Sequence, residues 1–292
     1  MTYGCFKIQE YGVFVNKEQF AYCYLITQGI YCTGIINQSC QKGIFIKMFE
    51  LFVRGKTLPE AYHNALAALH ENNDEVPCPD YDTNQKEASM TFVVEEPLAE
   101  PMISKMFIGD PRSLEQYRQE LLDGILDFEV EKGKWDYTYH QRMEKQIPWV
   151  IEDLKRNKES RRAVILVRTE YDMTTDAPAC LQHIQYMIRN ETLHSKVLFR
   201  SNDSTKATFM NAFALILLQK RIADALDVPV GTYTHRANSF HVYERDYDMF
   251  DGYLRRIKAG GELTYDYEGE WDEMMEDAKP EIAKMVEELK NR

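Results

Sequence analysis

The sequence lacks the features that mark several classes of protein. Its 292 residues carry a formal net charge of −12 at pH 7, so it has no basic excess for general nucleic-acid binding. No apolar run approaches the roughly 18 residues of a membrane span, and no basic region with an apolar core follows Met1. We therefore expect a cytoplasmic protein with no membrane partner, in which any phosphate is bound by a local group of arginines.

Cysteine is scarce, and glycine-rich phosphate loops and internal repeats are missing. The six cysteines include no C-x-x-C pair, and five of them precede residue 79. This spacing favours reduced, unligated thiols, with disulfides or zinc as the alternative for the early group. We expect no metal site. Cys180 stands alone in the remaining two thirds of the chain and is the first candidate for chemistry.

The residue pattern predicts an α+β fold. With 44% hydrophobic and 28% charged residues, the chain suits one large domain with an appendage. Residues 1–50 alternate aromatic and small residues between Gly and Asn turns, which predicts a strand-rich N-terminal extension. We interpret this extension as an added sheet layer or a dimer contact. Residues 51–292 are expected to form the main domain.

Helix and strand signals are spread along the main domain. Capping boxes predict helices over 57–71, from Thr57, and from Ser113. Prolines at the first turn predict helices from Pro148 and from Pro280. An apolar stripe that begins at Phe209 predicts a helix over 209–227. Strands are expected over 90–97, 163–167, 181–188, 195–200 and 231–246, with a turn near 190–191. The polar segment 72–88 is predicted to be a loop.

The stretch from 178 to 211 gathers residues that suit covalent chemistry on a nucleotide. Cys180 precedes a strand, Arg200-Ser201-x-Asp203 follows it, and Asn211 lies eight residues after Asp203. A thiol, an anion-binding pair and an amide on adjacent elements can bind a phosphorylated base and attack it.

Other polar residues have both a functional and a structural interpretation. Arg161-Arg162 before a strand is either a solvated end or an anion site, because arginine binds phosphate through two hydrogen bonds. His241 and Tyr243 project from one side of their strand, where they hold a sugar hydroxyl or fill the core. Glu120 borders the apolar face of its helix, a position that is most often a solvated flank.

Several of these segments together resemble the thymidylate synthase family, which includes the pyrimidine nucleotide hydroxymethylases. The segments are SRRAVILV, D-x-P-x-C with a following Gln, FRSNDSTKATFMN and SFHVY, and they occur in the family's order. WDYTYHQR is most similar to the shorter archaeal-type members. The resemblance spans roughly residues 90–250. It implies a large mixed β-sheet flanked by helices, and a homodimer whose sheets pack back to back.

The resemblance implies catalytic roles for four residues. Cys180 matches the nucleophile that adds to C6 of the pyrimidine, after which C5 takes up a one-carbon unit. Asp203 matches the aspartate that supports the bound pyrimidine and the folate. Tyr139 matches a site tyrosine in a Y-x-x-R segment. Glu120 matches the glutamate that orders water at the pyrimidine carbonyl and moves protons.

The resemblance also implies a phosphate site shared between two subunits. Arg200 matches the arginine that binds the nucleotide phosphate, with Ser201 beside it. Arg161 and Arg162 match the pair that reaches this phosphate from the partner subunit. An obligate homodimer with shared active sites follows.

Three further matches concern the nucleoside. His241 and Tyr243 match the pair that binds the deoxyribose 3′-hydroxyl, and Asn211 matches the residue that reads the base edge. An amide can pair with O4 and N3–H of uracil, whereas hydroxymethylases acting on cytosine typically place an aspartate there. We therefore favour dUMP over dCMP, since a mismatched pattern leaves a buried group unpaired.

The sequence departs from the family pattern at several positions. Leu181 replaces the histidine after the nucleophile, as in archaeal-type relatives, and Pro178 lies two residues before Cys180. Ala207 to Met210 replace a glycine-proline pair. No arginine-threonine-glycine loop precedes the 90–97 strand, and an acidic helix stands where many synthases have a small apolar tail. These changes affect the phosphate and pterin sites.

We predict reductive methylation of dUMP with 5,10-methylenetetrahydrofolate or a related reduced pterin. The alternatives are a dUMP or dCMP hydroxymethylase, in which water adds to the exocyclic methylene, and a non-catalytic nucleotide-binding homologue. A hydrolase that pairs Cys180 with His183 is a third alternative. Residues three apart on a strand point to opposite faces, which argues against it.

Overall fold

The computed structural model describes residues 11–14, 20–26, 29–32 and 49–292, and the chain divides into two units. In the first unit, Met1–Ile46, strands β1 (Tyr11–Phe14), β2 (Phe20–Ile26) and β3 (Gly29–Cys32) form an antiparallel sheet. The strands predicted within 33–48 lie outside the described residues. The second unit, Lys47–Arg292, contains every predicted site residue. No helix among the described residues is long and apolar enough to cross a membrane.

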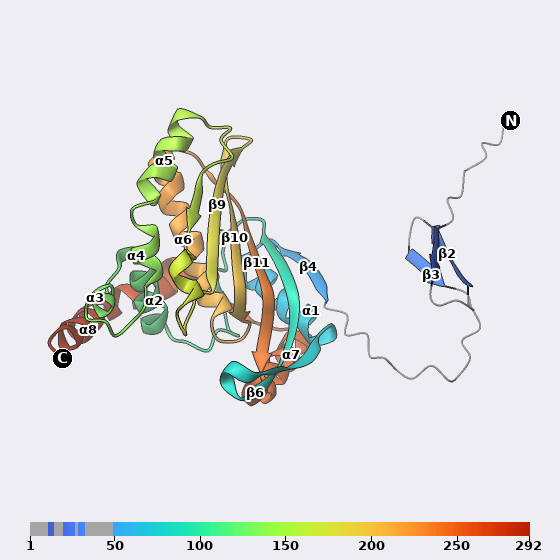
Figure 1. The fold of residues 1–292 in the computed structure, drawn as a ribbon. Helices are drawn as coiled ribbons and strands as arrows, with labels where there is room; N and C mark the ends of the chain where they lie inside the picture. The colour runs from blue at the N-terminus through green and yellow to red at the C-terminus, as the bar shows by residue number, and fades with distance from the viewer. Residues whose placement is uncertain (1–10, 15–19, 27–28, 33–48) are drawn as a thin grey trace. The chain divides into compact units, whose positions relative to one another are not determined.

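A seven-stranded mixed sheet forms the centre of the second unit, which confirms the predicted fold class (Figure 1). Its order is β4-β6-β11-β10-β9-β8, with β5 beside β6. The pairs β4–β6 and β10–β11 are parallel, and the other pairs are antiparallel. The strands are β4 (Glu50–Gly55), β5 (Asp74–Cys78), β6 (Thr83–Val94), β8 (Val164–Leu166), β9 (Leu181–Arg189), β10 (Thr192–Asp203) and β11 (Val230–Tyr243).

Three helices pack against this sheet and share one core with it (Figure 1). Helix α1 (Leu58–Glu71) packs on β4 and β6, α6 (Thr208–Leu226) on β10 and β11, and α5 (Ile147–Arg156) on β8 and β9. Alternate residues of β10, from Leu193 through Val197 to Phe199, point into this core. The period-two alternation fixes which face of each strand is buried.

The other face of the sheet carries a row of residues in register across six strands. The row points away from the core and is half-buried or exposed, with Leu166 59% and Phe52 58% exposed. It runs Leu166, His183, Leu198, Arg236, Thr91, Phe52. Three large apolar side chains and three polar ones therefore share one open surface.

The prediction of a loop over 72–88 is wrong, because this segment forms a β-hairpin. Strand β5 pairs with the first half of β6, whose residues 85–88 also pair with the end of β11. The residues are mostly polar, so no apolar alternation marks them as strands. Backbone pairing on both sides of β6 supplies the hydrogen bonds that hold the segment extended.

Two predicted helix boundaries are also wrong. Helix α2 (Pro111–Asp123) is capped by Asp110, which forms a capping box with Ser113, so Ser113 is not the first residue. It ends at Gly124 in the left-handed conformation (φ 66°), so Ile125 lies beyond it. Helix α8 (Asp272–Lys290) begins eight residues before Pro280, which lies on its exposed surface.

The other predictions of elements are confirmed within a few residues. Thr57 caps α1, and the hairpin between β9 and β10 turns at Asn190 and Glu191, both with positive φ. Strands β7 (Ile103–Ser104) and β12 (Thr264–Tyr265) form a separate two-stranded sheet. The other α-helices are α3 (Phe128–Glu131), α4 (Tyr139–Met143) and α7 (Tyr247–Ala259).

Candidate active site

Three neighbouring strands bring the predicted nucleophile, phosphate ligands and sugar ligands to one end of the sheet. The Arg200 N–H on β10 donates to the Cys180 carbonyl just before β9, at 2.8 Å. In the parallel pair β10–β11, Asp203 lies opposite His241 and Ser201 lies opposite Ser239. Residues far apart in sequence are thus held together by sheet register.

Arg200 secures the backbone that leads to the cysteine. Its Nη2 donates to the Pro178 carbonyl at 2.8 Å and its Nε to the Ala179 carbonyl at 3.2 Å. Burial raises the pKa of the Cys180 thiol, and the Arg200 guanidinium offsets part of that rise. The arginine therefore both positions the thiol and favours its ionised form.

Asp172 holds the loop before the cysteine from the other side, and sequence reasoning did not identify it. Its carboxylate accepts from the Ala179 N–H at 2.9 Å, the Thr169 N–H at 2.7 Å and Arg142 Nη1 at 2.8 Å. Burial raises the pKa of Asp172, but these hydrogen bonds and the arginine charge together hold it well below its usual range. The only hint in the sequence was Arg142 of the Y-x-x-R segment, which needs a carboxylate partner such as Asp172.

His241 and Tyr243 lie on the same side of β11, as predicted, with ring centroids 4.7 Å apart. His241 is 2% exposed, and its Nδ1 lies 3.4 Å from the Ser201 hydroxyl. Its Nε2 is buried without a partner among the described residues. Burial lowers the pKa of His241, which keeps the ring neutral and leaves Nε2 for a ligand group.

Asp203 and Glu87 lie beside this pair. One oxygen of Asp203 accepts from the Thr205 and Lys206 N–H groups, both at 2.9 Å, and so turns the chain into α6. Glu87 on β6 accepts from the Ser239 hydroxyl at 2.5 Å. Because the hairpin was predicted as a loop, Glu87 was not considered.

Asn211 lies in the first turn of α6 and is 5% exposed. Its Oδ1 accepts a short hydrogen bond from the Tyr117 hydroxyl on α2. The sequence alone did not single out Tyr117. The contact joins residues 94 positions apart, which no local pattern reveals.

A cavity of about 230 Å³ opens beside Tyr117 and contains Glu120 and Tyr139. Burial raises the pKa of Glu120, whose carboxylate accepts from Gln116 Nε2 at 2.8 Å. The Tyr139 hydroxyl accepts from the Leu181 N–H at 3.4 Å, one residue after Cys180. The other lining residues are Leu121, Leu126, Trp135, Tyr137 and Thr138.

This cavity is close to the thiol. Burial raises the pKa of Tyr117, Tyr137 and Tyr139, and the negative charge of a Cys180 thiolate adds to the rise in each. The three hydroxyls therefore keep their protons. Tyr117 and Tyr139 in the cavity lining thus connect Glu120 with Asn211 and with the residue after Cys180.

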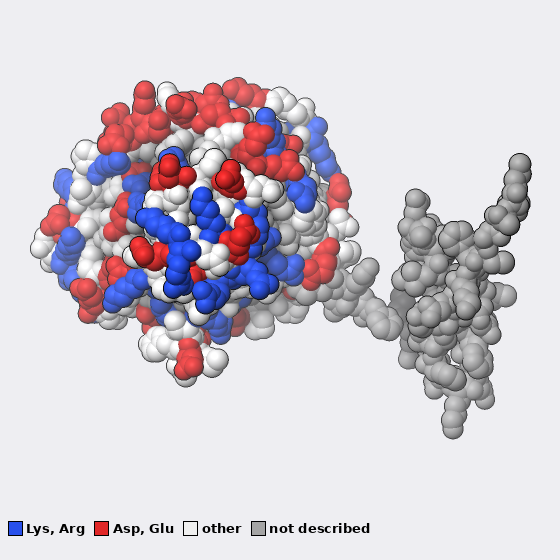
Figure 2. Space-filling model, turned by 90° about the horizontal axis from the view of Figure 1, so that it is seen from above, with Lys and Arg blue, Asp and Glu red and all other residues white. Residues whose placement is uncertain are grey.

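Arg161 and Arg162 are not part of this group. Val164 pairs with Gln185, five residues along β9 from Cys180, which corresponds to about 17 Å. Both arginines are exposed, and Arg162 lies 3.4 Å from Asp153. Figure 2 shows lysine and arginine side chains gathered on the α5 end of the molecule. Within one chain, these arginines do not reach the phosphate ligands.

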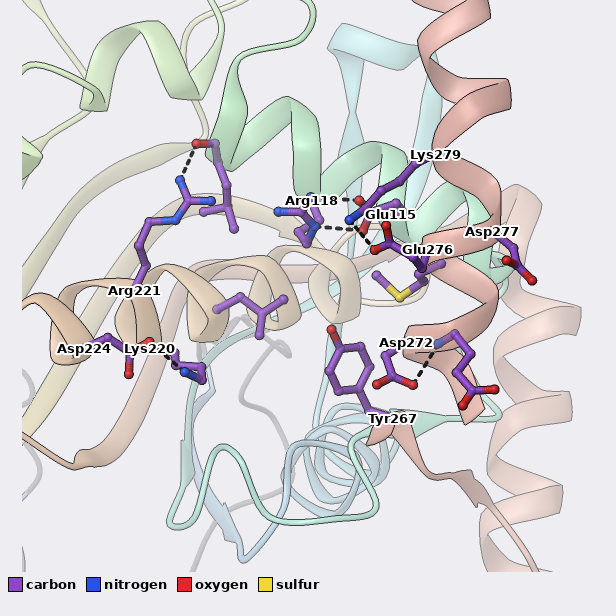
Figure 3. Close-up of a pocket in the computed structure, with 14 residues that line it drawn as sticks. Glu115, Arg118, Lys220, Arg221, Asp224, Tyr267, Asp272, Glu276, Asp277 and Lys279 are labelled. Atoms are coloured by element: carbon purple, nitrogen blue, oxygen red, sulfur yellow. Dashed lines mark hydrogen bonds and ion pairs between the residues drawn. The ribbon is translucent and has the colours of Figure 1, made fainter. Parts of the chain in front are cut away.

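A second cavity, of about 890 Å³, lies on the other side of α2, against α6 and α8 (Figure 3). It has six carboxylates and four cations in its lining. Each cation is paired, for example Lys220 with Asp224 at 2.6 Å and Arg118 with Glu115 at 2.7 Å. None of the predicted site residues lines it, and its acidic balance does not suit a phosphate.

Comparison with known proteins relates this chain to thymidylate synthases. The family model for thymidylate synthase matches residues 115–282. A putative thymidylate synthase of Methanocaldococcus jannaschii is 30% identical over 215 residues, which are 70% of this chain and 96% of that protein. A thymidylate synthase of Bacillus phage phi3T is 28% identical over 137 residues, 46% of this chain and 48% of that protein.

The fold agrees with a solved structure. Thermostable thymidylate synthase A of Bacillus subtilis matches with a TM-score of 0.56 and 16% identity, over 68% of this chain and 84% of that chain. The chain therefore belongs to the thymidylate synthase family and is an enzyme of the methyltransferase kind. The resemblance read from the sequence is confirmed.

Proposed function

We propose that the protein methylates dUMP to dTMP with 5,10-methylenetetrahydrofolate. The observation that carries this proposal is the convergence of Cys180, Arg200 and Asn211 on one end of the sheet. In this arrangement the thiol matches C6 of a uracil nucleotide, the cation matches its phosphate, and the carboxamide matches its O4–N3 edge.

The residues suggest how the pyrimidine is activated. The Cys180 thiolate forms an S–C6 bond, and the electron pair of the C5–C6 double bond moves toward O4. The Asn211 amide donates to O4 and stabilises the charge that develops there. Glu120, with its raised pKa, holds or releases a proton at the same carbonyl. Carbon C5 thereby becomes nucleophilic.

A phosphate site for dUMP requires residues from two chains. Arg200 and Ser201 lie beside Cys180, whereas Arg161 and Arg162 do not reach it within one chain. We propose a homodimer in which the open face of the sheet packs against a second copy. Mixing Cys180→Ser with Arg161→Ala/Arg162→Ala protein then restores activity in part, because the mixed dimer contains one intact site.

The cavity beside Glu120 fits part of a reduced pterin. Trp135 and Tyr137 offer flat aromatic surfaces, and the Glu120 carboxyl offers a hydrogen bond to ring nitrogens. These residues would hold the pterin, which supplies the one-carbon unit and the hydride when bound. Asp203 has one carboxylate oxygen outside the turn bonds and is the second polar candidate.

One observation favours hydroxymethylation as a second candidate. Trp135 in the cavity lining is 44% exposed, so water can approach the reacting carbon. Hydration of the methylene competes with hydride transfer wherever water is not excluded.

A single incubation distinguishes these outcomes. The protein is mixed with methylenetetrahydrofolate and either dUMP or dCMP, and nucleotide mass and dihydrofolate are measured. We expect a methylated uracil nucleotide together with dihydrofolate. A hydroxymethyl product without dihydrofolate would refute methylation, and nucleotide binding without any product would favour a non-catalytic homologue.

A further inference from the structure

Tyr117 connects several parts of the candidate site. Its hydroxyl donates to Asn211 Oδ1, and its ring lines the cavity that contains Glu120 and Tyr139. It comes from α2, whereas Asn211 comes from α6. A residue in this position can influence how the base is read without touching the reacting carbon.

A carboxamide alone does not choose between uracil and cytosine. In one orientation it presents N–H to ring position 4 and oxygen to position 3, which matches O4 and N3–H of uracil. Rotated by half a turn, it presents oxygen to the N4 amine and N–H to N3 of cytosine. Selectivity therefore depends on the group that fixes the amide's orientation.

In this structure that group is the Tyr117 hydroxyl. Asn211 is 5% exposed, and none of residues 49–292 accepts a hydrogen bond from its Nδ2. A phenol is a better donor than acceptor, because its oxygen lone pair is delocalised into the ring. Rotation of the amide would leave the O–H without its carbonyl partner. Burial raises the pKa of Tyr117, so the hydroxyl keeps the proton that it donates.

We propose that Tyr117 is a specificity-determining positioning residue that holds the Asn211 amide in the orientation that reads uracil and rejects cytosine. This inference rests on the proposed function, since it assumes that Asn211 faces the base of a bound pyrimidine nucleotide.

The test compares Tyr117→Phe in two backgrounds. In the natural background, we expect the ratio of dCMP to dUMP dissociation constants to fall roughly tenfold, the worth of one hydrogen bond of about 1.4 kcal/mol. In an Asn211→Asp background, Tyr117→Phe leaves the ratio within about twofold, because a carboxylate presents acceptors in both orientations. Tyr186→Phe, which removes a buried tyrosine hydroxyl that has no hydrogen-bond partner among the described residues, is the matched control and leaves the ratio unchanged.

Calorimetric binding keeps this test separate from that of the proposed reaction. The inference is supported if Tyr117→Phe lowers the ratio of dCMP to dUMP dissociation constants only where residue 211 is asparagine. This holds even if no product forms. Equal weakening of both nucleotides, or the same shift in both backgrounds, overturns it, because a purely structural role predicts that result. Circular dichroism verifies that each variant is folded, and Tyr117→Leu, which also lacks a hydrogen-bond donor, replaces Tyr117→Phe if the latter unfolds. Failure of the wild type to bind either nucleotide would overturn both proposals.

Discussion

The two sides of helix α2 show that the size of a cavity and its chemical suitability are different properties. Toward α4 and the nucleophile, Tyr117 and Glu120 line about 230 Å³. Toward α6 and α8, Glu115 and Arg118 line about 890 Å³. The larger cavity contains more charges, but its cations are satisfied by neighbouring carboxylates or carbonyls.

In the smaller cavity, the carboxylate of Glu120 has no cation to pair with among the described residues. Glu120 accepts one hydrogen bond, from a neutral amide, and its pKa is raised by burial. Carboxyls in clefts whose pKa is raised by burial are candidates for functional sites, whereas paired surface charges contribute little to stability. The comparison predicts that equal chemical changes on the two sides have very different effects.

Replacement of Cys180 by Ser should have the largest effect. A serine hydroxyl is a much weaker nucleophile at neutral pH, so we expect turnover to fall on the order of 10⁴-fold or more. Steady-state assay with dUMP and methylenetetrahydrofolate measures this loss, and calorimetry verifies that nucleotide binding is retained. Full turnover by the variant would show that another residue attacks the base.

Glu120→Gln is expected to lower kcat roughly 10²-fold, the typical contribution of a positioned proton donor or acceptor. The change keeps the shape of the side chain and removes the titratable group. Activity within twofold of the wild type would remove Glu120 from the mechanism.

Asp172→Asn should destabilise the protein by about 3 kcal/mol, because it removes the buried carboxylate that pairs with half-buried Arg142. Urea unfolding followed by circular dichroism measures the change. Since the folded pKa of Asp172 is depressed, the wild type keeps this contribution above about pH 4 and loses it as the pH falls further. A variant as stable as the wild type at pH 7 would contradict this role.

Alkylation of Cys180 should depend steeply on pH. Because burial raises the thiol pKa, the thiolate fraction and the rate with iodoacetamide rise about tenfold per pH unit near neutrality. Arg200→Gln removes the compensating charge, raises the pKa further and slows alkylation several-fold at pH 8. Peptide mass spectrometry follows Cys180 separately from Cys78. A rate that is flat between pH 6 and 8 would contradict this.

Glu276→Gln is the counterpart of Glu120→Gln in the larger cavity and should have the smallest effect. Glu276 is exposed and pairs with Lys279, so turnover is expected to stay within about twofold. The same assay measures both variants. A loss comparable to that of Glu120→Gln would show that the larger cavity takes part in the reaction.

Much of the fold was predictable, because apolar periodicity marks elements that bury one face. The stripe from Leu58 to Leu69 and the alternation in β10 both reflect burial against one core. The hairpin at 74–94 could not be predicted in this way, because its residues are mostly polar and are held by backbone pairing within the hairpin and with β11. The prediction of a helix that starts at Pro280 was wrong for another reason, since this proline lies on the exposed surface inside α8 and does not mark its first residue.

The candidate site was predictable where spacing reflects strand register. Cys180 and Arg200 come together because β9 and β10 form one hairpin. The contacts of Tyr117 with Asn211 and of Asp172 with Arg142 depend on tertiary packing between distant segments. Neither spacing nor composition encodes such contacts, so these residues emerge only from the structure.

The central claim is that Cys180 adds to C6 of a uracil nucleotide, and hydrogen exchange at C5 tests it without any cofactor. Addition makes C5 basic, so C5 takes up deuterium from D₂O. Removal of the original C5 proton then expels the Cys180 thiolate and returns dUMP labelled at that carbon. We predict that the wild type catalyses this exchange, followed by NMR of the C5 proton, and that Cys180→Ser does not. The account would be contradicted if the wild type bound dUMP but exchanged its C5 proton no faster than the uncatalysed reaction. It would also be contradicted if Cys180→Ser catalysed the exchange as fast as the wild type.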